Sequence, residues 1–324
     1  MTIVSTKNDN WQVQVSQLEQ ERSLWQEMVA NKRSPHTKKA YEIDLRDFFQ
    51  FHAVELSQSS IMQFLQLDRS QAIQLVLKFR RYLVDERKLK AASVNRKINS
   101  IKALVRHGHD VGCCPWRLDV EALHPLKVEP YRDTRGVSAT DIKKILSHPD
   151  RTTLVGKRDY AMLMLLWGNG LRSSEVIGLD ISDIDLSDRS IWIKGKGKSD
   201  KQQIRINNST VEAIRDWLQH RVNYYSSNSN ALFISLSSTK RGERLNYISL
   251  YYLVDRTSEA VGISKKMSPH RVRHSAITAV LERNGGNIRK AQSFSRHADP
   301  KTLMVYDDNL QQPQAEMSDL LEVF

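Results

Sequence analysis

Residues 268–274 read Ser-Pro-His-Arg-Val-Arg-His, and they open a stretch, ending at Tyr306, that carries most of the information about this chain. Ser268 is a residue type that caps helix N-termini, and Pro269 suits the first helical position because its missing N–H would be unpaired there. Apolar residues follow at helical spacing: Ile277, Val280 and Leu281. The pattern therefore predicts a helix that begins at Pro269.

His270 and Arg273 fall in the first turn of this predicted helix and lie on one face of it. A helix N-terminus presents free N–H groups and the positive end of the helix dipole, both of which favour an anion. An imidazole and a guanidinium added at that end make a candidate phosphate site.

A second helix start follows at Asp299 and Pro300 and leads to Tyr306. His297 stands just before it, 9 positions upstream of the tyrosine. Cationic and proton-handling side chains together with a phenol near the C-terminal end indicate phosphoryl transfer with a tyrosine nucleophile.

The order His-x-x-Arg, then His, then Tyr resembles the tyrosine recombinases, the family of phage integrases and of Xer- and Cre-type enzymes. Residues 170–175, Gly-Leu-Arg-Ser-Ser-Glu, resemble the family's Gly-Leu-Arg-x-Ser-Glu box, and residues 194–198, Lys-Gly-Lys-Gly-Lys, resemble the β-hairpin that carries its lysine. The resemblance extends from about Ser34 to Tyr306. Each motif alone is weak, but all of them in the family's order and spacing are a specific signal.

The resemblance implies a mainly α-helical chain with a small β-hairpin or sheet, in two domains that form a clamp on DNA. Residues 1–130 would be a helical, SAM-like core-binding bundle, and residues 131–324 an α+β catalytic domain. The stretch 124–133 supports this boundary, because it holds two prolines and several charges but no periodic pattern. The apolar end of the chain, after residue 316, is expected to form a helix that docks on a neighbouring protomer; docking on its own domain is the alternative.

Six residues are implied to be catalytic: Arg172, Lys196, His270, Arg273, His297 and Tyr306. The two arginines would hold the non-bridging oxygens of the scissile phosphate, which guanidinium groups fit well. Tyr306 would attack phosphorus and form a 3′-phosphotyrosyl bond, with His270 as its base. Lys196 would protonate the departing 5′-oxygen, and His297 would hydrogen-bond the phosphate or shuttle a proton.

Three parts of this assignment leave alternatives. Other lysines near the predicted hairpin compete with Lys196 for the leaving-group role: Lys194, Lys198 and Lys201. Glu175 is expected to orient its neighbours rather than to take part in the chemistry. Arg296 stands where the family usually has glycine, so the loop around His297 differs from the family pattern, and Arg296 is a further candidate phosphate contact.

The charge of the chain also favours a polyanionic partner. There are 49 Lys and Arg against 37 Asp and Glu, a formal net charge of +12. Double-stranded DNA is the partner expected from the motifs, although a basic surface can also be merely solvated. The residues predicted to contact DNA are Lys38, Lys39, Arg96, Lys97, Lys102, Lys198, Lys201, Lys240 and Arg241.

Several classes of protein are excluded or disfavoured. The only cysteines, Cys113 and Cys114, are adjacent, so we expect no disulfide framework and a reducing compartment. The acidic stretch 180–188 lacks the spacing of a calcium loop, and no zinc pattern occurs, so neither a metal nor a cofactor is expected. The longest apolar run, 161–167, is too short for a bilayer, and no signal peptide is apparent. We expect a cytoplasmic protein, associated with the nucleoid while it acts.

The function predicted from these motifs is site-specific DNA recombination. A homo-tetramer, with a dimer on each site, would exchange strands between two DNA sites through a Holliday junction, without metal or ATP. Two alternatives are an enzyme similar to type IB topoisomerases, which relaxes one duplex, and a DNA-binding regulator that keeps the fold but does not cut.

Overall fold

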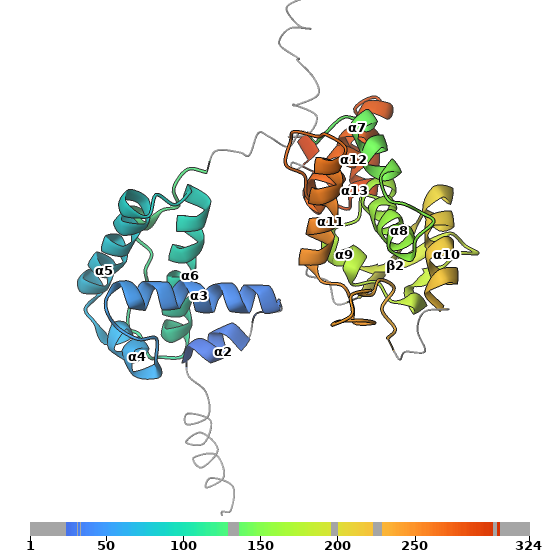
Figure 1. Cartoon of the computed structure of the whole chain (residues 1–324). Helices are drawn as coiled ribbons and strands as arrows, with labels where there is room; N and C mark the ends of the chain where they lie inside the picture. The colour runs from blue at the N-terminus through green and yellow to red at the C-terminus, as the bar shows by residue number, and fades with distance from the viewer. Residues whose placement is uncertain are drawn as a thin grey trace, which may run out of the picture. The chain divides into compact units, whose positions relative to one another are not determined.

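The computed structural model describes residues 24–30, 32, 34–128, 136–195, 200–222, 229–300 and 303–304. These residues form helices and one small sheet (Figure 1), which confirms the prediction of a mainly α-helical chain with a β-hairpin. The chain divides into two compact units, Met1–Pro130 and Tyr131–Phe324, each with its own hydrophobic core. In the part of the chain that is described, no helix has the length and apolar character needed to cross a membrane.

The first unit is a bundle of helices. Its elements are α2 (Leu24–Ala30), α3 (Pro35–Phe51), α4 (Gln58–Gln66), α5 (Arg69–Arg81), the π-helix η1 (Tyr82–Glu86), α6 (Ala91–Asp110) and the short 3₁₀-helix η2 (Glu121–Leu123). Aromatic rings fill the centre: the Phe48 ring lies 5.2 Å from that of Phe64 and 5.4 Å from that of Phe79, in edge-to-face arrangements. The three rings join α3, α4 and α5 into one core.

A buried carboxylate ties α3 to α6 beside this core. Asp44 is fully buried and accepts hydrogen bonds from Arg96 Nη1 at 2.7 Å, Lys97 Nζ at 3.1 Å and Ser100 Oγ at 3.0 Å. Lys97 also pairs with Asp47 at 2.8 Å, and only 7% of its side chain is exposed. This burial argues against the predicted contact of Lys97 with DNA, because its ammonium group is held between two carboxylates of α3.

The second unit surrounds a helix that is buried on most sides. Its helices are α7 (Ala139–Ser147), α8 (Leu154–Gly168), α9 (Ser173–Ile177), the 3₁₀-helix η3 (Ile181–Asp183), α10 (Asn208–Val222), α11 (Tyr247–Ala260), α12 (Pro269–Arg283) and α13 (Ile288–Ser295). Helix α8 contacts α7, α10 and α12, and residues 161–166 of it are all buried. The unbroken apolar run at 161–167 accounts for this burial, because a helix that is apolar on nearly all sides packs into a core.

The sheet has three antiparallel strands in the order β1 (Ile184–Asp185), β2 (Ser190–Lys194) and β3 (Lys201–Arg205). Ile191 pairs with Ile204, and Lys194 pairs with Lys201 at the end of the hairpin. The predicted hairpin is thus present. Its turn at 196–199 lies outside the described residues, and with it Lys196 and Lys198.

Candidate active site

The turn between α8 and α9 places Arg172. Gly170 has a φ of +55°, and a Cβ there would lie 2.7 Å from Phe294 Cε1, so both the conformation and the space require glycine. Arg172 follows as the N-cap residue of α9, and its backbone N–H donates to Glu175 Oε2 at 2.8 Å. The Gly-Leu-Arg-x-Ser-Glu pattern therefore encodes a tight turn with its own carboxylate cap.

Two groups hold the Arg172 guanidinium. Its Nη1 donates to Glu175 Oε1 at 2.8 Å, and its Nη2 donates to the Arg296 carbonyl at 3.3 Å. Burial raises the pKa of Glu175, but the charges of Arg296 and Arg172 outweigh that effect and hold the pKa below its usual range. Glu175 is therefore ionised at neutral pH, and 24% of the Arg172 side chain stays exposed.

Helix α12 supplies the second arginine. It begins at Pro269, as predicted, and the Ser268 hydroxyl caps it by accepting the N–H of Arg271 at 3.3 Å. Arg273 is 1% exposed and donates to the carbonyl oxygens of Gly170 and Ser295. Its guanidinium thus links the turn before α9 to the end of α13.

Three histidines lie among these cations, and each has a lowered pKa. Burial is the largest cause for His270, followed by the charges of Arg273 and Arg172. Burial and the same two arginines lower the pKa of His297 to about 4. His274, whose ring centroid lies 4.1 Å from that of His270, has its pKa lowered to about 3, chiefly by burial. All three imidazoles are neutral at pH 7, so His270 can accept a proton.

The structure therefore gathers four of the predicted catalytic residues, from α9, α12 and the segment after α13: Arg172, His270, Arg273 and His297. Lys196 and Tyr306 lie outside the described residues. His274 packs against His270 and was not among the residues predicted to be catalytic. Within the described ranges, no three His, Cys, Asp or Glu side chains are grouped as a metal site would need.

Arg296 does not face the phosphate site as the sequence suggested. It ends α13 with a left-handed φ of 57°, a conformation that explains why the family usually has glycine there. Its guanidinium turns inward, donating from Nη2 to Glu175 Oε2 at 2.9 Å and from Nη1 to the Phe294 carbonyl at 2.9 Å. Only 10% of the side chain is exposed, so the expected phosphate contact is corrected to a buried ion pair.

The acidic stretch 180–188 binds cations of its own chain. Lys201 Nζ lies 2.5 Å from Asp183 Oδ1, and this hydrogen bond is the main reason that the pKa of Lys201 is raised. Asp180 pairs with Arg244. Lys201 thus lies near two carboxylates while 40% of its side chain stays exposed, and its role as a DNA contact or as a competitor of Lys196 remains a prediction.

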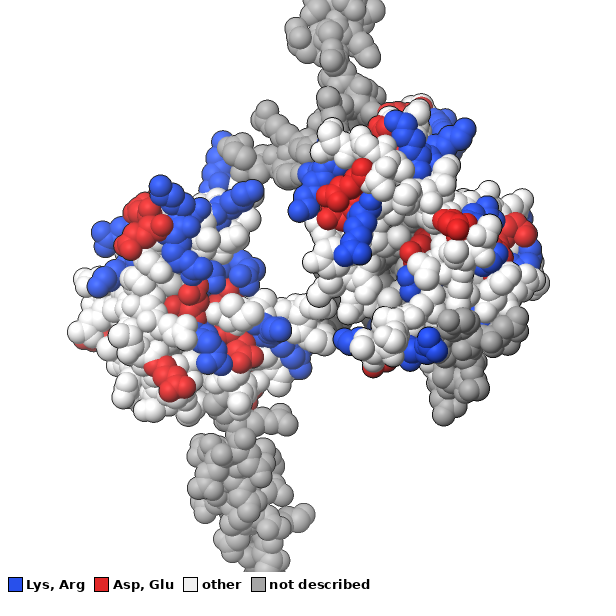
Figure 2. Space-filling view, in the orientation of Figure 1, with Lys and Arg blue, Asp and Glu red and all other residues white. Residues whose placement is uncertain are grey.

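The other predicted DNA contacts differ in the exposure of their side chains. Figure 2 shows Lys and Arg side chains grouped at several places on the visible face of each unit. Lys39, Lys240 and Arg241 are exposed, and Lys38 is half-buried. Arg96 is exposed but bonded to Asp44, and Lys102 Nζ donates to the Leu123 carbonyl at 2.8 Å.

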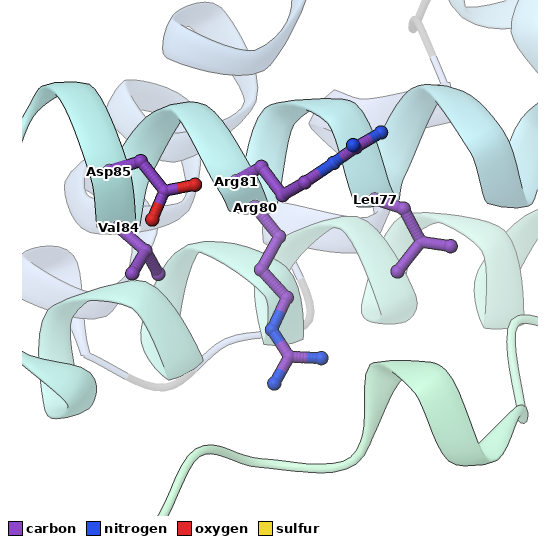
Figure 3. Close-up of a pocket in the computed structure, with 5 residues that line it drawn as sticks. All are labelled: Leu77, Arg80, Arg81, Val84 and Asp85. Atoms are coloured by element: carbon purple, nitrogen blue, oxygen red, sulfur yellow. The ribbon is translucent and has the colours of Figure 1, made fainter.

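A pocket on α5 and η1 of the first unit is separate from these groups. It is lined by Leu77, Arg80, Arg81, Val84 and Asp85 (Figure 3). Arg80 extends away from its helix and donates to the Ala122 carbonyl of η2. The pocket contains none of the predicted catalytic or DNA-contact residues, so we assign it no role in the chemistry.

Known proteins match both halves of the chain. The model of the "Phage integrase family" matches residues 136–312, and that of the "Phage integrase, N-terminal SAM-like domain" matches residues 23–107. Tyrosine recombinase slr0733 of Synechocystis is 44% identical over 93% of this chain and 95% of its own length. Tyrosine recombinase XerC of Pelobacter propionicus is 30% identical over 89% of this chain and 87% of its own.

Solved structures share the fold. XerH recombinase in a post-cleavage complex with its difH substrate has a TM-score of 0.69 at 18% identity, covering 99% of this chain and 92% of that one. A lambda integrase dimer bound to a COC′ core site has a TM-score of 0.61 at 15% identity, covering 86% of this chain and 93% of that one. Together with the family models and the relatives, these findings show that the chain belongs to the phage integrase family of tyrosine recombinases.

Proposed function

We propose that this recombinase cleaves and rejoins double-stranded DNA through a 3′-phosphotyrosyl bond on Tyr306. The observation that carries the proposal is the convergence of two guanidiniums and two neutral imidazoles at the start of α12. A phosphodiester in an in-line displacement needs its non-bridging oxygens stabilised, its nucleophile deprotonated and its leaving oxygen protonated.

In the proposed step, the Tyr306 oxygen attacks phosphorus while the bond from phosphorus to the 5′-oxygen breaks. The phenolic proton passes to His270, whose lowered pKa keeps it neutral and able to accept. Lys196 gives a proton to the departing 5′-oxygen. The reverse reaction with a different 5′-hydroxyl joins a new pair of strands, and because the phosphotyrosyl bond preserves the energy of the original bond, no ATP is consumed.

Arg172 and Arg273 would hold the two non-bridging oxygens. The turn at Gly170 positions both arginines. Arg172 lies two residues after Gly170, and Arg273 donates to the Gly170 carbonyl. This shared support favours a fixed spacing between the two guanidiniums. His297 follows α13 directly and would donate to the phosphate from its neutral ring.

The test is a DNA site nicked close to the cleavage position, so that the short 5′-hydroxyl strand diffuses away and cleavage is trapped. The wild-type protein should give a covalent protein–DNA adduct on a denaturing gel, and Tyr306→Phe should give none. Tyr82→Phe is the matched control, because Tyr82 stacks on Phe51 in the first unit and phenylalanine preserves that contact. An adduct from Tyr306→Phe equal to that of the wild type would assign the nucleophile elsewhere.

Assembly is the second part of the proposal. We infer a tetramer on two DNA sites, joined by the C-terminal segment of one copy on the next. Its apolar residues are Met317, Leu320, Leu321, Val323 and Phe324, among acidic ones. On the second unit, a hollow between α8 and α11 offers a candidate surface, with exposed Val155 and Tyr252 beside Arg256. Asp150 and Asp159 also line it, and Asp159 pairs with Arg158.

A chain ending at residue 314 tests this assembly. It should still form the adduct on a single nicked site, but sedimentation with DNA should no longer show a species with four protein copies. A tetramer of undiminished amount would mean that the segment docks on its own unit. Relaxation of supercoiled plasmid without any recombinant product from the full chain would instead favour the topoisomerase alternative.

A further inference from the structure

Three charged side chains form a continuous row of contacts beneath the proposed phosphate site. Glu175, which is 1% exposed, pairs with Arg172 at 2.8 Å through one oxygen and with Arg296 at 2.9 Å through the other. Arg172 is the outermost member, with 24% of its side chain exposed, against 10% for Arg296. The row therefore runs from the surface that would meet DNA into the interior.

The carboxylate at the centre of this row has two opposing effects on Arg172. It fixes the guanidinium by accepting from both the backbone N–H and Nη1 of Arg172. Its negative charge, however, would cancel the positive charge that Arg172 should offer to a phosphate, especially in a buried setting where charges are weakly screened. A second guanidinium on the far oxygen leaves the row with one net positive charge.

Arg296 also supports the two phosphate arginines through the backbone. Its carbonyl accepts from Arg172 Nη2 at 3.3 Å, and its own Nη2 donates to the Gly170 carbonyl at 3.1 Å. The Gly170 carbonyl also accepts from Arg273. Glycine at position 296 would keep the left-handed turn and the carbonyl contact, but it would lose the guanidinium contacts.

We propose that Arg296 is a positioning residue that neutralises Glu175, so that Arg172 keeps both its orientation and its full charge toward the scissile phosphate. Arg296 itself does not touch the DNA. The inference rests on the proposed function, because it assumes that Arg172 binds the phosphate. Arg296, which stands where the family usually has glycine, would thus have an electrostatic role in catalysis in addition to any effect on folding.

The experiment compares two nicked substrates in single-turnover cleavage. One has the ordinary scissile phosphate. The other carries a methyl group in place of one non-bridging oxygen, so the reacting group is uncharged and needs less positive charge around it. Cleavage is counted as adduct plus any hydrolysed product. The variants are Arg296→Gly, Arg296→Lys and the double variant Arg296→Gly with Glu175→Gln, each checked for DNA affinity and for its thermal midpoint.

On the ordinary phosphate, Arg296→Gly should lower the cleavage rate by about 10- to 100-fold, the scale expected for a misplaced catalytic group, with DNA affinity within about threefold. On the uncharged substrate the loss should shrink to about threefold or less, because the missing charge matters less there. Arg296→Lys keeps the charge and should lose less than Arg296→Gly. The double variant removes the buried carboxylate and should recover part of the rate.

An equal loss on both substrates, or no loss on either, would overturn the proposal, since a merely structural latch does not respond to the charge of the phosphate. If Arg296→Gly does not fold, Arg296→Gln carries the same test, because it removes the charge and keeps a long polar side chain beside Glu175. Tyr306→Phe on the ordinary substrate separates the two proposals. An adduct from that variant would refute the nucleophile while leaving the comparison of the Arg296 variants intact.

Discussion

Each unit contains a buried carboxylate that pairs with two basic side chains, but the two carboxylates differ in what they hold in place. Asp44 and Glu175 are almost fully buried, and each pairs with two cationic side chains. Asp44 joins two long helices of the bundle, next to an aromatic core. Glu175 joins a five-residue helix to the end of α13, next to the proposed phosphate site. The same ion-pair chemistry therefore joins two helices in one unit, and in the other it holds Arg172, the proposed phosphate ligand.

The difference lies in what each carboxylate does to its exposed arginine. In the Asp44 cluster, the exposed arginine is Arg96, with 48% of its side chain accessible. In the Glu175 cluster, the exposed arginine is Arg172, with 24% accessible. Lys97, Asp47 and Arg87 complete the first cluster, which holds two acidic and three basic groups, because Arg87 pairs with Asp47 at 2.7 Å. The second cluster has two basic groups and one acidic group, so each cluster carries one excess positive charge. The clusters differ in that Arg172 lies near Arg273, and the charges of both arginines act on His270.

The largest expected effect on the cleavage rate comes from removing the Arg172 side chain at the proposed catalytic site. Arg172→Ala should lower single-turnover cleavage by about 1,000-fold, because one charged contact to a developing phosphate charge is lost. The free energy of unfolding should change by less than about 1.5 kcal/mol, because Glu175 keeps Arg296 as a partner. Adduct formation on the nicked site and urea denaturation measure the two quantities. A loss of stability without a loss of rate would make the two clusters alike.

Removing the Asp44 carboxylate should lower the stability of the first unit and leave the cleavage rate nearly unchanged. Asp44→Ala leaves the buried Lys97 with Asp47 as its remaining carboxylate, and it should destabilise the first unit by about 3 kcal/mol. The cleavage rate per folded molecule should stay within about twofold of the wild type. Urea denaturation followed by the fluorescence of Trp116, which lies in that core, reports the first quantity. An unchanged midpoint would show that this cluster is not a packing device.

The sequence predicted the Glu175 cluster better than the Asp44 cluster, for physical reasons. The helix start at Pro269 is local, so a short pattern predicted it, and the resemblance marked residues 170–175 and supplied the roles. The inward turn of Arg296 depends on Glu175, 121 positions earlier, and no local pattern contains that contact. Position 296 signalled only that something differed from the family.

The burial of Lys97 did leave a signal in the sequence, which the charge pattern obscured. Lys97 lies three positions after Val94 and four before Ile101, so it falls within the apolar stripe of α6. Asp44 stands next to Leu45 and four positions before Phe48, on the apolar side of α3. A lysine and an aspartate that both interrupt apolar stripes predict a buried pair better than they predict a contact with DNA.

The buried histidines of the second unit add a pH dependence to its stability, and in the first unit burial likewise lowers the pKa of His52. The pKa of His297 falls to about 4 and that of His274 to about 3 in the folded chain, against about 6.5 when unfolded. Below pH 6.5 the unfolded state therefore binds protons that the folded state does not. Stability should fall as the pH drops from 6.5 toward 4, with a slope of at most about 1.4 kcal/mol per pH unit for each histidine.

Urea midpoints at pH 7 and pH 5 measure this dependence. His274→Gln should make the second unit less sensitive to acid than the wild type, because one of the groups that takes up a proton on unfolding is gone. The Asp44 cluster contains no histidine, so Asp44→Ala should not alter the difference between the two pH values. A His274→Gln protein as acid-sensitive as the wild type would place the proton uptake elsewhere.

The smallest effect is expected from the loss of Arg96, the exposed arginine paired with Asp44. This variant tests whether Arg96 also contacts DNA. Arg96→Ala should lower the free energy of unfolding by less than about 1 kcal/mol, because Asp44 keeps Lys97 and Ser100 as donors.

Arg46→Ala is the matched control: Arg46 lies on α3 and pairs with Glu42 at similar exposure. If Arg96 also contacts a DNA phosphate, its loss should weaken binding at every sequence and reduce the slope of log affinity against log salt by about 1, whereas the control leaves the slope unchanged. Equal slopes in the two variants would confine Arg96 to the interior cluster, and the Asp44 cluster would then serve only the fold.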